Sequence, residues 1–247
     1  MGTSGLLEAH DLVKSFPARD GAADVPVLRG ISLAVSPGEL VAIVGPSGSG
    51  KSTLLYCLAG LEPISAGSVV MLGQRVESLS RRALADVRRN HVGFVFQSYN
   101  LIASLSARDN VALPARLAKR RVSDAAVEAA LARVGLAERS GYKPAALSGG
   151  QQQRVAIARV LAMQPDIVFA DEPTGALDTA AGDTVLQLLR EAATEDRSVV
   201  MVTHDLEAAA RADRVLVLRD GVIHTELVAP TSAQILDAMT AASAVVK

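Results

Sequence analysis

One segment, residues 40–58, constrains the fold of this chain more than any other feature. The apolar run Leu40–Val44 leads into a glycine-rich stretch at residues 45–53, which reads GPSGSGKST, and leucines at helical spacing follow it. This order predicts a buried strand, a tight turn and a helix. In such a turn, successive backbone N–H groups point at an anion and the helix N-terminus adds its partial positive charge. The segment therefore predicts a phosphate-binding site.

The side chains of this stretch make the expected ligand more specific. The pattern G-x-x-x-x-G-K-[ST] lets Lys51 reach the β- and γ-phosphates of a nucleotide and lets the Ser52 hydroxyl bind Mg²⁺. We therefore expect a nucleoside triphosphate with Mg²⁺. The residues expected to bind it are Gly45, Pro46, Ser47, Gly48, Ser49, Gly50, Lys51, Ser52 and Thr53.

A second motif places two acids at the end of an apolar run. Residues 166–170 read DIVFA, and Asp171 and Glu172 follow directly. Both carboxylates then lie at the carboxyl edge of the sheet, where open α/β sheets bind ligands. Asp171 is suited to hold Mg²⁺ and Glu172 to act on the attacking water as a general base. The loop alone fits a kinase, a GTPase, a helicase or a transporter ATPase, and this acidic pair begins to separate these classes.

A third motif places a Gly-Gly turn at the start of a predicted helix. Residues 147–154 read LSGGQQQR, so exposed N–H groups and the Ser148 hydroxyl form another anion site. This string resembles the signature sequence of ABC-type ATPases and is far more specific than the phosphate loop. The resemblance extends from about Leu6 to Ile223 and implies that the nucleotide is ATP.

The resemblance also implies roles for isolated residues. Gln97, in the string VGFVFQ, is similar to the glutamine that joins the core to a helical lobe and contacts Mg²⁺ and water. His204, after an apolar strand, is similar to the switch histidine at the γ-phosphate. Residues 175–178, GALD, resemble the loop that crosses a dimer interface, although the family more often has Ser where Gly175 stands. Phe16 matches the aromatic residue that stacks on adenine, which is more commonly Tyr.

These assignments give one expected site. We expect catalysis to depend on Glu172, His204, Gln97 and Lys51. We expect Mg²⁺ to be bound by Ser52, Gln97 and Asp171. Beyond the phosphate loop, the residues expected to contact the nucleotide are Phe16, Ser148, Gly149, Gly150, Gln151 and Asp178.

The pattern of the whole chain predicts an α/β fold. The first ninety or so residues predict short strands broken by turns, at residues 6–13, 27–35 and 40–44, followed by a hairpin at residues 68–76. Residues 100–141 are helical in character, with Ser123 as an N-cap. After residue 166, apolar strands alternate with amphipathic helices, which is typical of a parallel sheet, and residues 222–223 return as an antiparallel edge.

The resemblance implies a P-loop NTPase (RecA-like) core with a mainly parallel sheet, an antiparallel β subdomain and an inserted helical subdomain. We expect a single domain at residues 5–228, with the core at 5–97 and 154–228 and the helical subdomain at 98–153. Residues 229–247 form an Ala-rich tail, in which we expect partial disorder and a short helix from Ser232.

Composition limits where such a chain works and what it binds. It has 247 residues, 25 Lys and Arg against 26 Asp and Glu, and a formal net charge of −1, which argues against a nucleic-acid partner bound through a basic surface. Its apolar runs are strand-sized, whereas a bilayer crossing needs about 20 residues. The single cysteine, Cys57, rules out an internal disulfide and fits a reducing compartment. We expect a cytoplasmic protein.

Finer resemblance concerns the partners. The strings FVFQ, DNV and ADEPTGALD look most like the subgroup that includes macrolide-exporter, lipoprotein-release and cell-division ATPases. That subgroup implies a head-to-tail homodimer with ATP at the interface, driving a separate integral membrane permease at the inner face of the cell membrane. It leaves a second function open, in which the same dimer drives transmembrane signalling to an extracytoplasmic partner and transports no solute.

A short apolar stretch next to Gln97 has two interpretations. Tyr99, Leu101, Ile102 and Leu105 either dock the permease or pack the helical lobe. The sequence does not favour one over the other.

Overall fold

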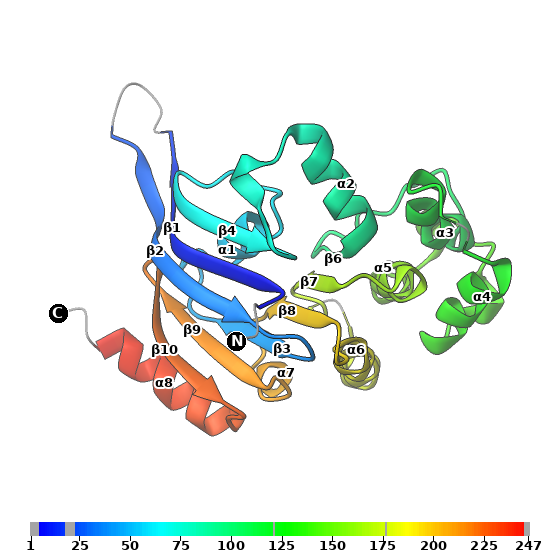
Figure 1. Cartoon of the computed structure of the whole chain (residues 1–247). Coiled ribbons are helices and arrows are strands. Elements are labelled where there is room, and N and C mark those ends of the chain that lie inside the picture. Colours follow the sequence, from blue (N-terminus) through cyan, green and yellow to red (C-terminus); the bar gives the residue numbers. More distant parts are fainter. Residues whose placement is uncertain (1–4, 18–22, 121, 176, 245–247) are drawn as a thin grey trace.

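The computed structural model describes residues 5–17, 23–120, 122–175 and 177–244. Two sheets lie next to each other, and a group of helices extends from one end of the larger sheet (Figure 1). None of the helices in the described ranges has the length and apolar character that a bilayer crossing requires.

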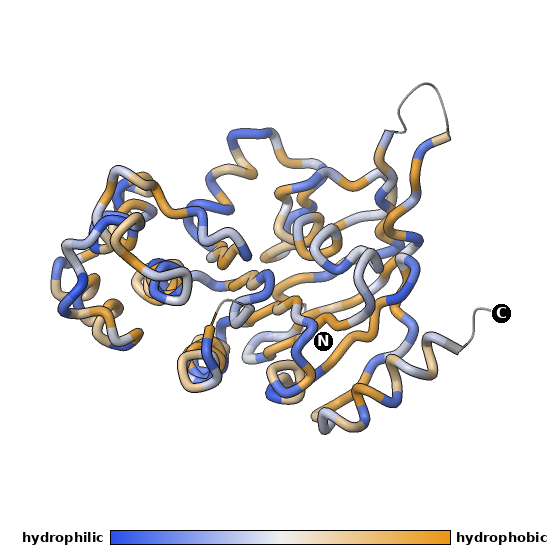
Figure 2. The backbone as a smooth tube through the Cα atoms, turned by 180° about the vertical axis from the view of Figure 1, so that it is seen from behind, coloured by the Kyte–Doolittle hydropathy of each residue, from blue (hydrophilic) through white to orange (hydrophobic). Residues whose placement is uncertain are grey.

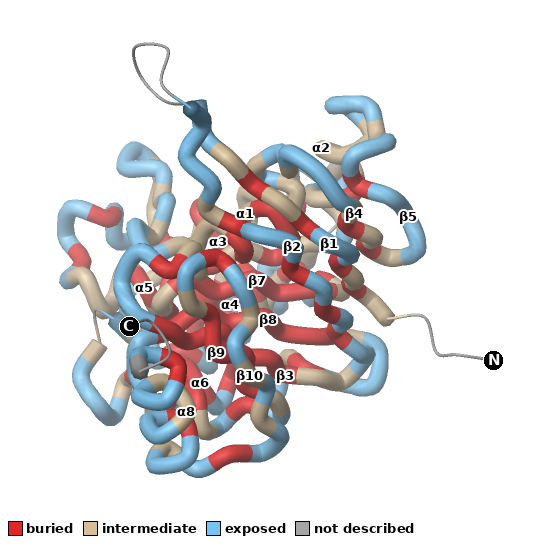
Figure 3. The backbone as a smooth tube through the Cα atoms, turned by 90° about the vertical axis from the view of Figure 1, so that its left-hand side faces the viewer, coloured by how far each residue is buried: buried red, intermediate tan, exposed pale blue. Residues whose placement is uncertain are grey.

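The larger sheet is six-stranded and mainly parallel, as predicted. In spatial order its strands are β10 (Val222–Val228), β9 (Arg214–Arg219), β3 (Leu40–Val44), β8 (Ser198–Val202), β7 (Ile167–Asp171) and β6 (Val92–Val95). All neighbours pair in parallel except β10, which returns antiparallel to β9 as the edge hairpin. Every residue of β3, β7 and β8 is buried, because helices or the second sheet cover both faces (Figure 3).

The smaller sheet is four-stranded and antiparallel, and it confirms the predicted β subdomain. Its order is β2 (Val25–Val35), β1 (Leu7–Phe16), β4 (Ala66–Met71) and β5 (Gln74–Arg75). Strand β1 is longer than the predicted 6–13 and pairs as far as Phe16 with Val25. The extension is hidden in the sequence because Lys14 is charged. In the fold its ammonium group is buried against Glu62 Oε1, at 2.6 Å.

Eight α-helices occupy the described ranges, together with 3₁₀ turns at Val76–Ser78, Ala137–Arg139 and Pro144–Ala146. The helices are α1 (Lys51–Leu58), α2 (Arg81–His91), α3 (Ala107–Leu117), α4 (Asp124–Arg133), α5 (Gly149–Met163), α6 (Thr179–Ala192), α7 (Leu206–Ala209) and α8 (Ser232–Ala244).

Helices α3, α4 and α5 pack together into the helical lobe at one end of the molecule (Figure 1). Ser123 caps α4, as predicted, with its side chain accepting a hydrogen bond from the Ala126 N–H. The predicted boundary between residues 153 and 154 falls inside α5, which also packs on β6 and α6. The division into core 5–97 and 154–228 and helical subdomain 98–153 therefore stays a prediction.

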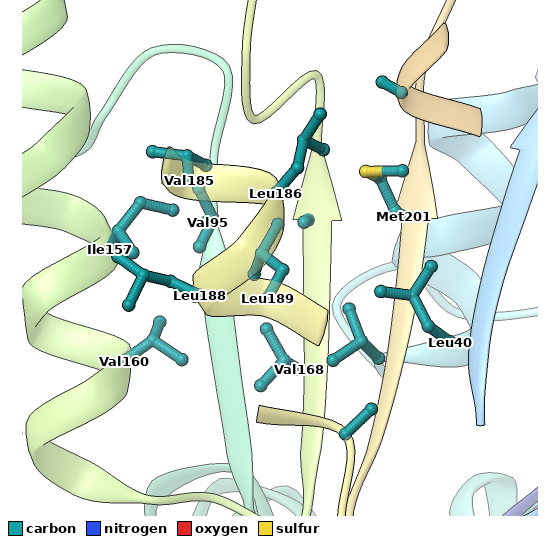
Figure 4. Close-up of a cluster of buried hydrophobic side chains, with 14 of the residues drawn as sticks. Leu40, Val95, Ile157, Val160, Val168, Val185, Leu186, Leu188, Leu189 and Met201 are labelled. Carbon is teal, nitrogen blue, oxygen red and sulfur yellow. The ribbon is translucent and has the colours of Figure 1, made fainter. Parts of the chain in front are cut away.

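Two apolar clusters cover the two faces of the parallel sheet. One lies against α5 and α6, and Figure 4 shows side chains of these helices meeting those of β3, β6, β7 and β8. The other lies between the two sheets and encloses α1 through Leu54, Leu55 and Leu58. Apolar residues concentrate along the strands between these layers (Figure 2).

The tail contains the helix that the sequence analysis expected from Ser232, and residues 245–247, at its end, lie outside the described residues. Helix α8 runs from Ser232 through Ala244, so it is not short, and it packs on β9, β10 and α7. Ile235 is fully buried there and joins the cluster against α5 and α6. Ala238, Met239 and Ala242 of the same helix also pack on this cluster, so the helix is held by tertiary packing along its length as well as by the high helix propensity of alanine.

One buried amide connects the segment after Gln97 to the helical lobe. Asn110 on α3 is 1% exposed. Its Oδ1 accepts from the Ile102 N–H at 2.7 Å, and its Nδ2 lies within 3.2 Å of the carbonyl oxygens of Ile102, Leu105 and Ser106. This side chain takes the place of backbone partners that a regular element would supply.

We expect Asn110→Asp to lower the free energy of unfolding by roughly 2–4 kcal/mol, because a carboxylate would face those carbonyl oxygens with no donor to offer. Urea unfolding measures it. The matched control is Asn90→Asp, since Asn90 makes a single helical bond to the Asp86 carbonyl oxygen in a half-buried position. Equal losses in the two variants would contradict the role given to Asn110.

Candidate functional site

The carboxyl ends of three neighbouring strands meet at one edge of the parallel sheet. Strand β8 lies between β3 and β7, and its residue Val202 pairs with Ile43 on one side and with Asp171 on the other. The phosphate loop follows β3, His204 follows β8, and Glu172 follows β7. The fold thus brings the phosphate loop and the acidic pair to the same sheet edge, as the sequence analysis predicted.

The phosphate loop follows directly after β3 and needs glycine at two positions. Gly45 has φ +153°, and a Cβ there would lie 2.0 Å from the Leu218 carbonyl oxygen. Gly50 has φ +98°, and a Cβ there would lie 2.9 Å from a methyl group of Leu28. In the part of the chain that the structure describes, Ser49 Oγ is buried in this loop without a hydrogen-bond partner. A buried, unpartnered hydroxyl in a turn of this kind fits a bound phosphate.

Lys51 begins helix α1 and folds back over the loop. Its Nζ donates to the carbonyl oxygens of Gly45 and Pro46, at 3.0 Å each. Partial burial lowers the pKa of this ammonium group, and the charges of Glu172 and Asp171 oppose the shift. Phosphate oxygens carry negative charge and would bind this ammonium group more strongly than the neutral carbonyl oxygens do.

Asp171 ends β7 and is 1% exposed. Ser52 Oγ donates to its Oδ1 at 3.1 Å, and the Tyr56 hydroxyl donates to its Oδ2 at 2.7 Å. Burial, the hydrogen bond to Asp171 and its negative charge raise the pKa of Tyr56 to about 12, so the phenol stays a donor. A carboxylate beside a serine hydroxyl offers the oxygen donors that Mg²⁺ prefers, and phosphate oxygens of a bound nucleotide would add to them.

Tyr56 was missed in the sequence analysis. It stands four residues after Ser52, so both side chains project from the same face of α1. That spacing is the one signal in the sequence, and the apolar residues around it, in the string LLYCL, made Tyr56 look like part of the core.

Glu172 and His204 form the second pair at this edge. His204 Nδ1 lies 2.9 Å from Glu172 Oε2, so the imidazole N–H donates to the carboxylate. The Glu172 side chain is 13% exposed and that of His204 is 74% exposed. Glu172 has φ +50°, a left-handed conformation that is uncommon outside glycine and that occurs at functional positions. This backbone turn separates the direction of Glu172 from that of Asp171.

Gln97 lies at the same sheet edge but makes no side-chain hydrogen bond within the described residues. It follows β6, where Val95 pairs with Ala170, the residue before Asp171. The turn after it has two left-handed residues, Tyr99 and Asn100, whose carbonyl oxygens accept from the Arg159 guanidinium on α5. Gln97 is exposed, and its roles in Mg²⁺ binding and catalysis stay predictions.

The signature turn forms a capped helix start in a different part of the chain. Ser148 Oγ accepts from the Gln151 N–H at 3.3 Å, and Gln151 Oε1 accepts from the Ser148 N–H at 3.0 Å, a reciprocal capping box. Gly149 and Gly150 form the first turn of α5, which packs on α3, α4, α6 and β6, whereas the phosphate loop opens α1, which packs on β2, β4, β7 and β8. One chain therefore carries the two motifs on separate elements.

Two further predicted contacts have structural roles in the chain. Asp178 caps α6, with its Oδ1 accepting from the Ala181 N–H at 2.9 Å. Phe16 is 36% exposed at the end of β1, and Lys14 Nζ lies 4.5 Å from the centroid of its ring. The predicted contacts of Asp178 and Phe16 with the nucleotide stay predictions. Ala176, within the loop at 175–178, lies outside the described residues.

Comparisons with known proteins agree with this geometry. The family described as ABC transporter matches residues 28–175. The chain is 47% identical over 231 residues to the macrolide export ATP-binding/permease protein MacB of Rhodopseudomonas palustris (strain HaA2), a match that covers 92% of this chain and 35% of the relative. MacB of Escherichia coli (strain K12) is 47% identical over 220 residues, covering 88% and 34%. The chain spans about a third of the length of these relatives.

Solved structures give the same result. The ATP-binding cassette MJ0796, determined as a dimer in a post-hydrolysis state with ADP and Pi, is 37% identical, with a TM-score of 0.85 over 91% of this chain and 99% of that one. CbiO1 of Clostridium perfringens, part of the ABC transporter complex cbiONQ, is 27% identical, with a TM-score of 0.77 over 95% and 91%. These likenesses confirm the P-loop NTPase core and the resemblance on which it was predicted. The chain belongs to the ABC transporter family, as one of its ATP-binding cassettes.

Proposed function

We propose that this chain is the ATPase motor of a membrane transporter and works with a membrane permease at the inner face of the cell membrane. The observation that carries the proposal is the convergence of Lys51, Ser52 and Asp171 with Glu172 and His204 at one sheet edge. The family of ATP-binding cassettes hydrolyses ATP, and these side chains supply the groups that such hydrolysis needs.

Each group has a distinct task in the proposed reaction. Lys51 exchanges its carbonyl partners for the β- and γ-phosphates and balances their charge. Ser52 and Asp171 would hold Mg²⁺, and such an ion would supply positive charge to balance the charge that develops on the phosphates. Glu172 takes a proton from the attacking water. His204, whose ring N–H holds Glu172 Oε2, keeps that carboxylate in place at the γ-phosphate position.

We propose a homodimer in which the signature turn of one copy completes the nucleotide site of the other. The proposal rests on the separate positions of the phosphate loop, before α1, and Ser148–Gln151, before α5. Two copies related by a two-fold axis can form two equivalent composite sites. The dimer with ADP and Pi of the MJ0796 cassette, which shares this fold, supports the arrangement.

Glu172→Gln tests the chemistry directly. Because glutamine keeps the shape but accepts no proton, we expect ATP binding to persist, an ATP-bound dimer to accumulate, and turnover to fall by about 10²–10⁴-fold. Phosphate release and size-exclusion chromatography with ATP measure these effects. The matched control is Glu195→Gln, in an exposed loop away from the site. Hydrolysis at the wild-type rate by Glu172→Gln would remove the base assigned here.

A groove beside the helical lobe supports the permease proposal. It has a volume of about 350 Å³ and lies between the core and the lobe. Phe94, Phe96, Leu113 and Pro114 contribute apolar surface to it, and Leu117, which is 63% exposed, lies at its side. Three arginines also line it: Arg88, Arg89 and Arg159. The groove thus fits a short segment with an apolar face and acidic groups, which we propose is a cytoplasmic segment of the permease.

The apolar stretch next to Gln97 divides between its two interpretations. Leu101 packs against the core cluster of the lobe, and the Tyr99 carbonyl oxygen holds Arg159. Ile102, by contrast, is 43% exposed. Leu117 is therefore a better position for testing docking than Tyr99 or Leu101, because its side chain is mostly exposed.

Leu117→Glu is expected to leave ATP binding and ATP hydrolysis of the isolated chain unchanged and to abolish its recovery with the permease. The reason is that a carboxylate would replace an exposed apolar contact at the groove. Pull-down from detergent-solubilised membranes of the source organism measures recovery. Leu236→Glu, at a position 53% exposed on α8, is the control. If Leu117→Glu is recovered as well as wild type, the groove is not the docking site.

The names of the relatives favour export over signalling. They describe macrolide export and join an ATP-binding part to a permease in one protein, of which this chain matches about a third. We propose that the permease served here exports a macrolide-like compound. The test is uptake of the exported compound into inverted vesicles that contain this chain and the permease, in the presence of ATP. Comparison of the wild-type chain with Glu172→Gln separates transport from an ATPase cycle that moves no solute.

A further inference from the structure

Two hydroxyl groups of one helix hold the two oxygens of the Asp171 carboxylate. Ser52 Oγ donates to Oδ1 at 3.1 Å and the Tyr56 hydroxyl donates to Oδ2 at 2.7 Å. Both residues lie on the same face of α1, one turn apart. The phosphate-loop motif accounts for Ser52, but no motif in the sequence contains Tyr56.

The two hydroxyls are not equivalent toward a cation. The Ser52 oxygen can bind a cation through a lone pair while its hydrogen continues to donate to Oδ1. Oδ1 and Ser52 Oγ are thus the oxygens of this group that would hold a cation. The Tyr56 hydroxyl holds the opposite oxygen, so the carboxylate plane cannot rotate without breaking this bond.

The ring of Tyr56 is itself held in place. It packs against Phe94, with ring centroids 5.8 Å apart and planes tilted by 44°. Phe94 stacks in turn on Phe96, at 4.1 Å, and on Phe169, at 6.0 Å. Because aromatic side chains in a packed cluster have few alternative rotamers, the hydroxyl has a fixed direction.

We propose that Tyr56 is a positioning residue for Mg²⁺: its hydroxyl anchors Asp171 Oδ2 so that Oδ1 and Ser52 Oγ face the same cation. This inference rests on the proposed nucleotide and Mg²⁺ site. Partners of this kind, one bond removed from a metal, orient the ligand and determine affinity for the metal. The competing explanation is that Tyr56 only compensates the burial of a carboxylate, in which case its loss lowers stability and leaves metal binding unchanged.

Tyr56→Phe separates the two explanations, because it removes the hydroxyl and keeps the ring on Phe94. Calorimetric titration with a β,γ-imido analogue of ATP is carried out once in EDTA and once in excess Mg²⁺. We expect the affinity in EDTA to equal that of wild type and the affinity in Mg²⁺ to fall by about 10-fold. The matched control is Tyr142→Phe, a tyrosine 45% exposed on the helical lobe, which should match wild type in both conditions.

Three results would overturn the inference. The first is an affinity of Tyr56→Phe for the analogue in Mg²⁺ that equals that of wild type, and the second is an equal loss of affinity in EDTA and in Mg²⁺. The third is a further loss of affinity when Tyr56→Phe is added to Asp171→Asn, a variant in which no carboxylate remains to be positioned. A wild-type chain that binds the analogue without any Mg²⁺ dependence would overturn the proposed metal site itself, which is a different result.

A second variant covers the case in which Tyr56→Phe does not fold. Phe94→Leu keeps the hydroxyl but removes the ring that holds it, so we expect a smaller loss, about 3-fold, again confined to the titration in Mg²⁺. An unchanged Mg²⁺ dependence in Phe94→Leu, with unfolded Tyr56→Phe, would show that Tyr56 stabilises the fold only.

Discussion

A carboxylate that is 1% exposed must be satisfied by its neighbours, and this requirement determines how the helix after the phosphate loop sits on the sheet. Asp171 ends the buried strand β7, and its two oxygens receive hydrogen bonds from Ser52 and Tyr56 of α1. Leu54, Leu55 and Leu58, on the other faces of the same helix, pack into the cluster between the two sheets. The polar contacts and the apolar packing thus fix a single orientation of α1, and that orientation places Lys51 and the loop at the sheet edge.

Glu172 follows Asp171 in the chain but lies in a different environment. Glu172 leaves the strand through a left-handed backbone conformation and meets His204 at a partly exposed position. Neighbouring acids therefore occupy different environments: two hydroxyl groups hold the carboxylate of Asp171, whereas His204 contacts that of Glu172. This difference supports the distinct roles proposed for them, in which Asp171 would bind a cation and Glu172 would accept a proton.

Much of this arrangement was predictable from the sequence, for reasons that differ between elements. Strand β3 was predicted with its correct bounds, because apolar residues fill it and a Pro-Gly turn and a glycine loop enclose it. Strand β1 was predicted too short, because a charged Lys14 conceals the pairing and its partner Glu62 is 48 residues away. Tyr56 was missed for a similar reason: its importance comes from an acid 115 residues later. Local patterns predict elements and motif residues, whereas contacts between distant residues depend on the packing of the whole chain.

The aromatic cluster of Phe94, Phe96 and Phe169 connects the groove beside the helical lobe with the residues around Asp171. Phe94 lines the groove between core and lobe and also packs on Tyr56, whose hydroxyl reaches Asp171. The groove wall and the buried carboxylate are therefore separated by the rings of Phe94 and Tyr56, whose centroids lie 5.8 Å apart. A partner side chain seated in the groove would touch a ring that itself packs on the ring whose hydroxyl holds Asp171.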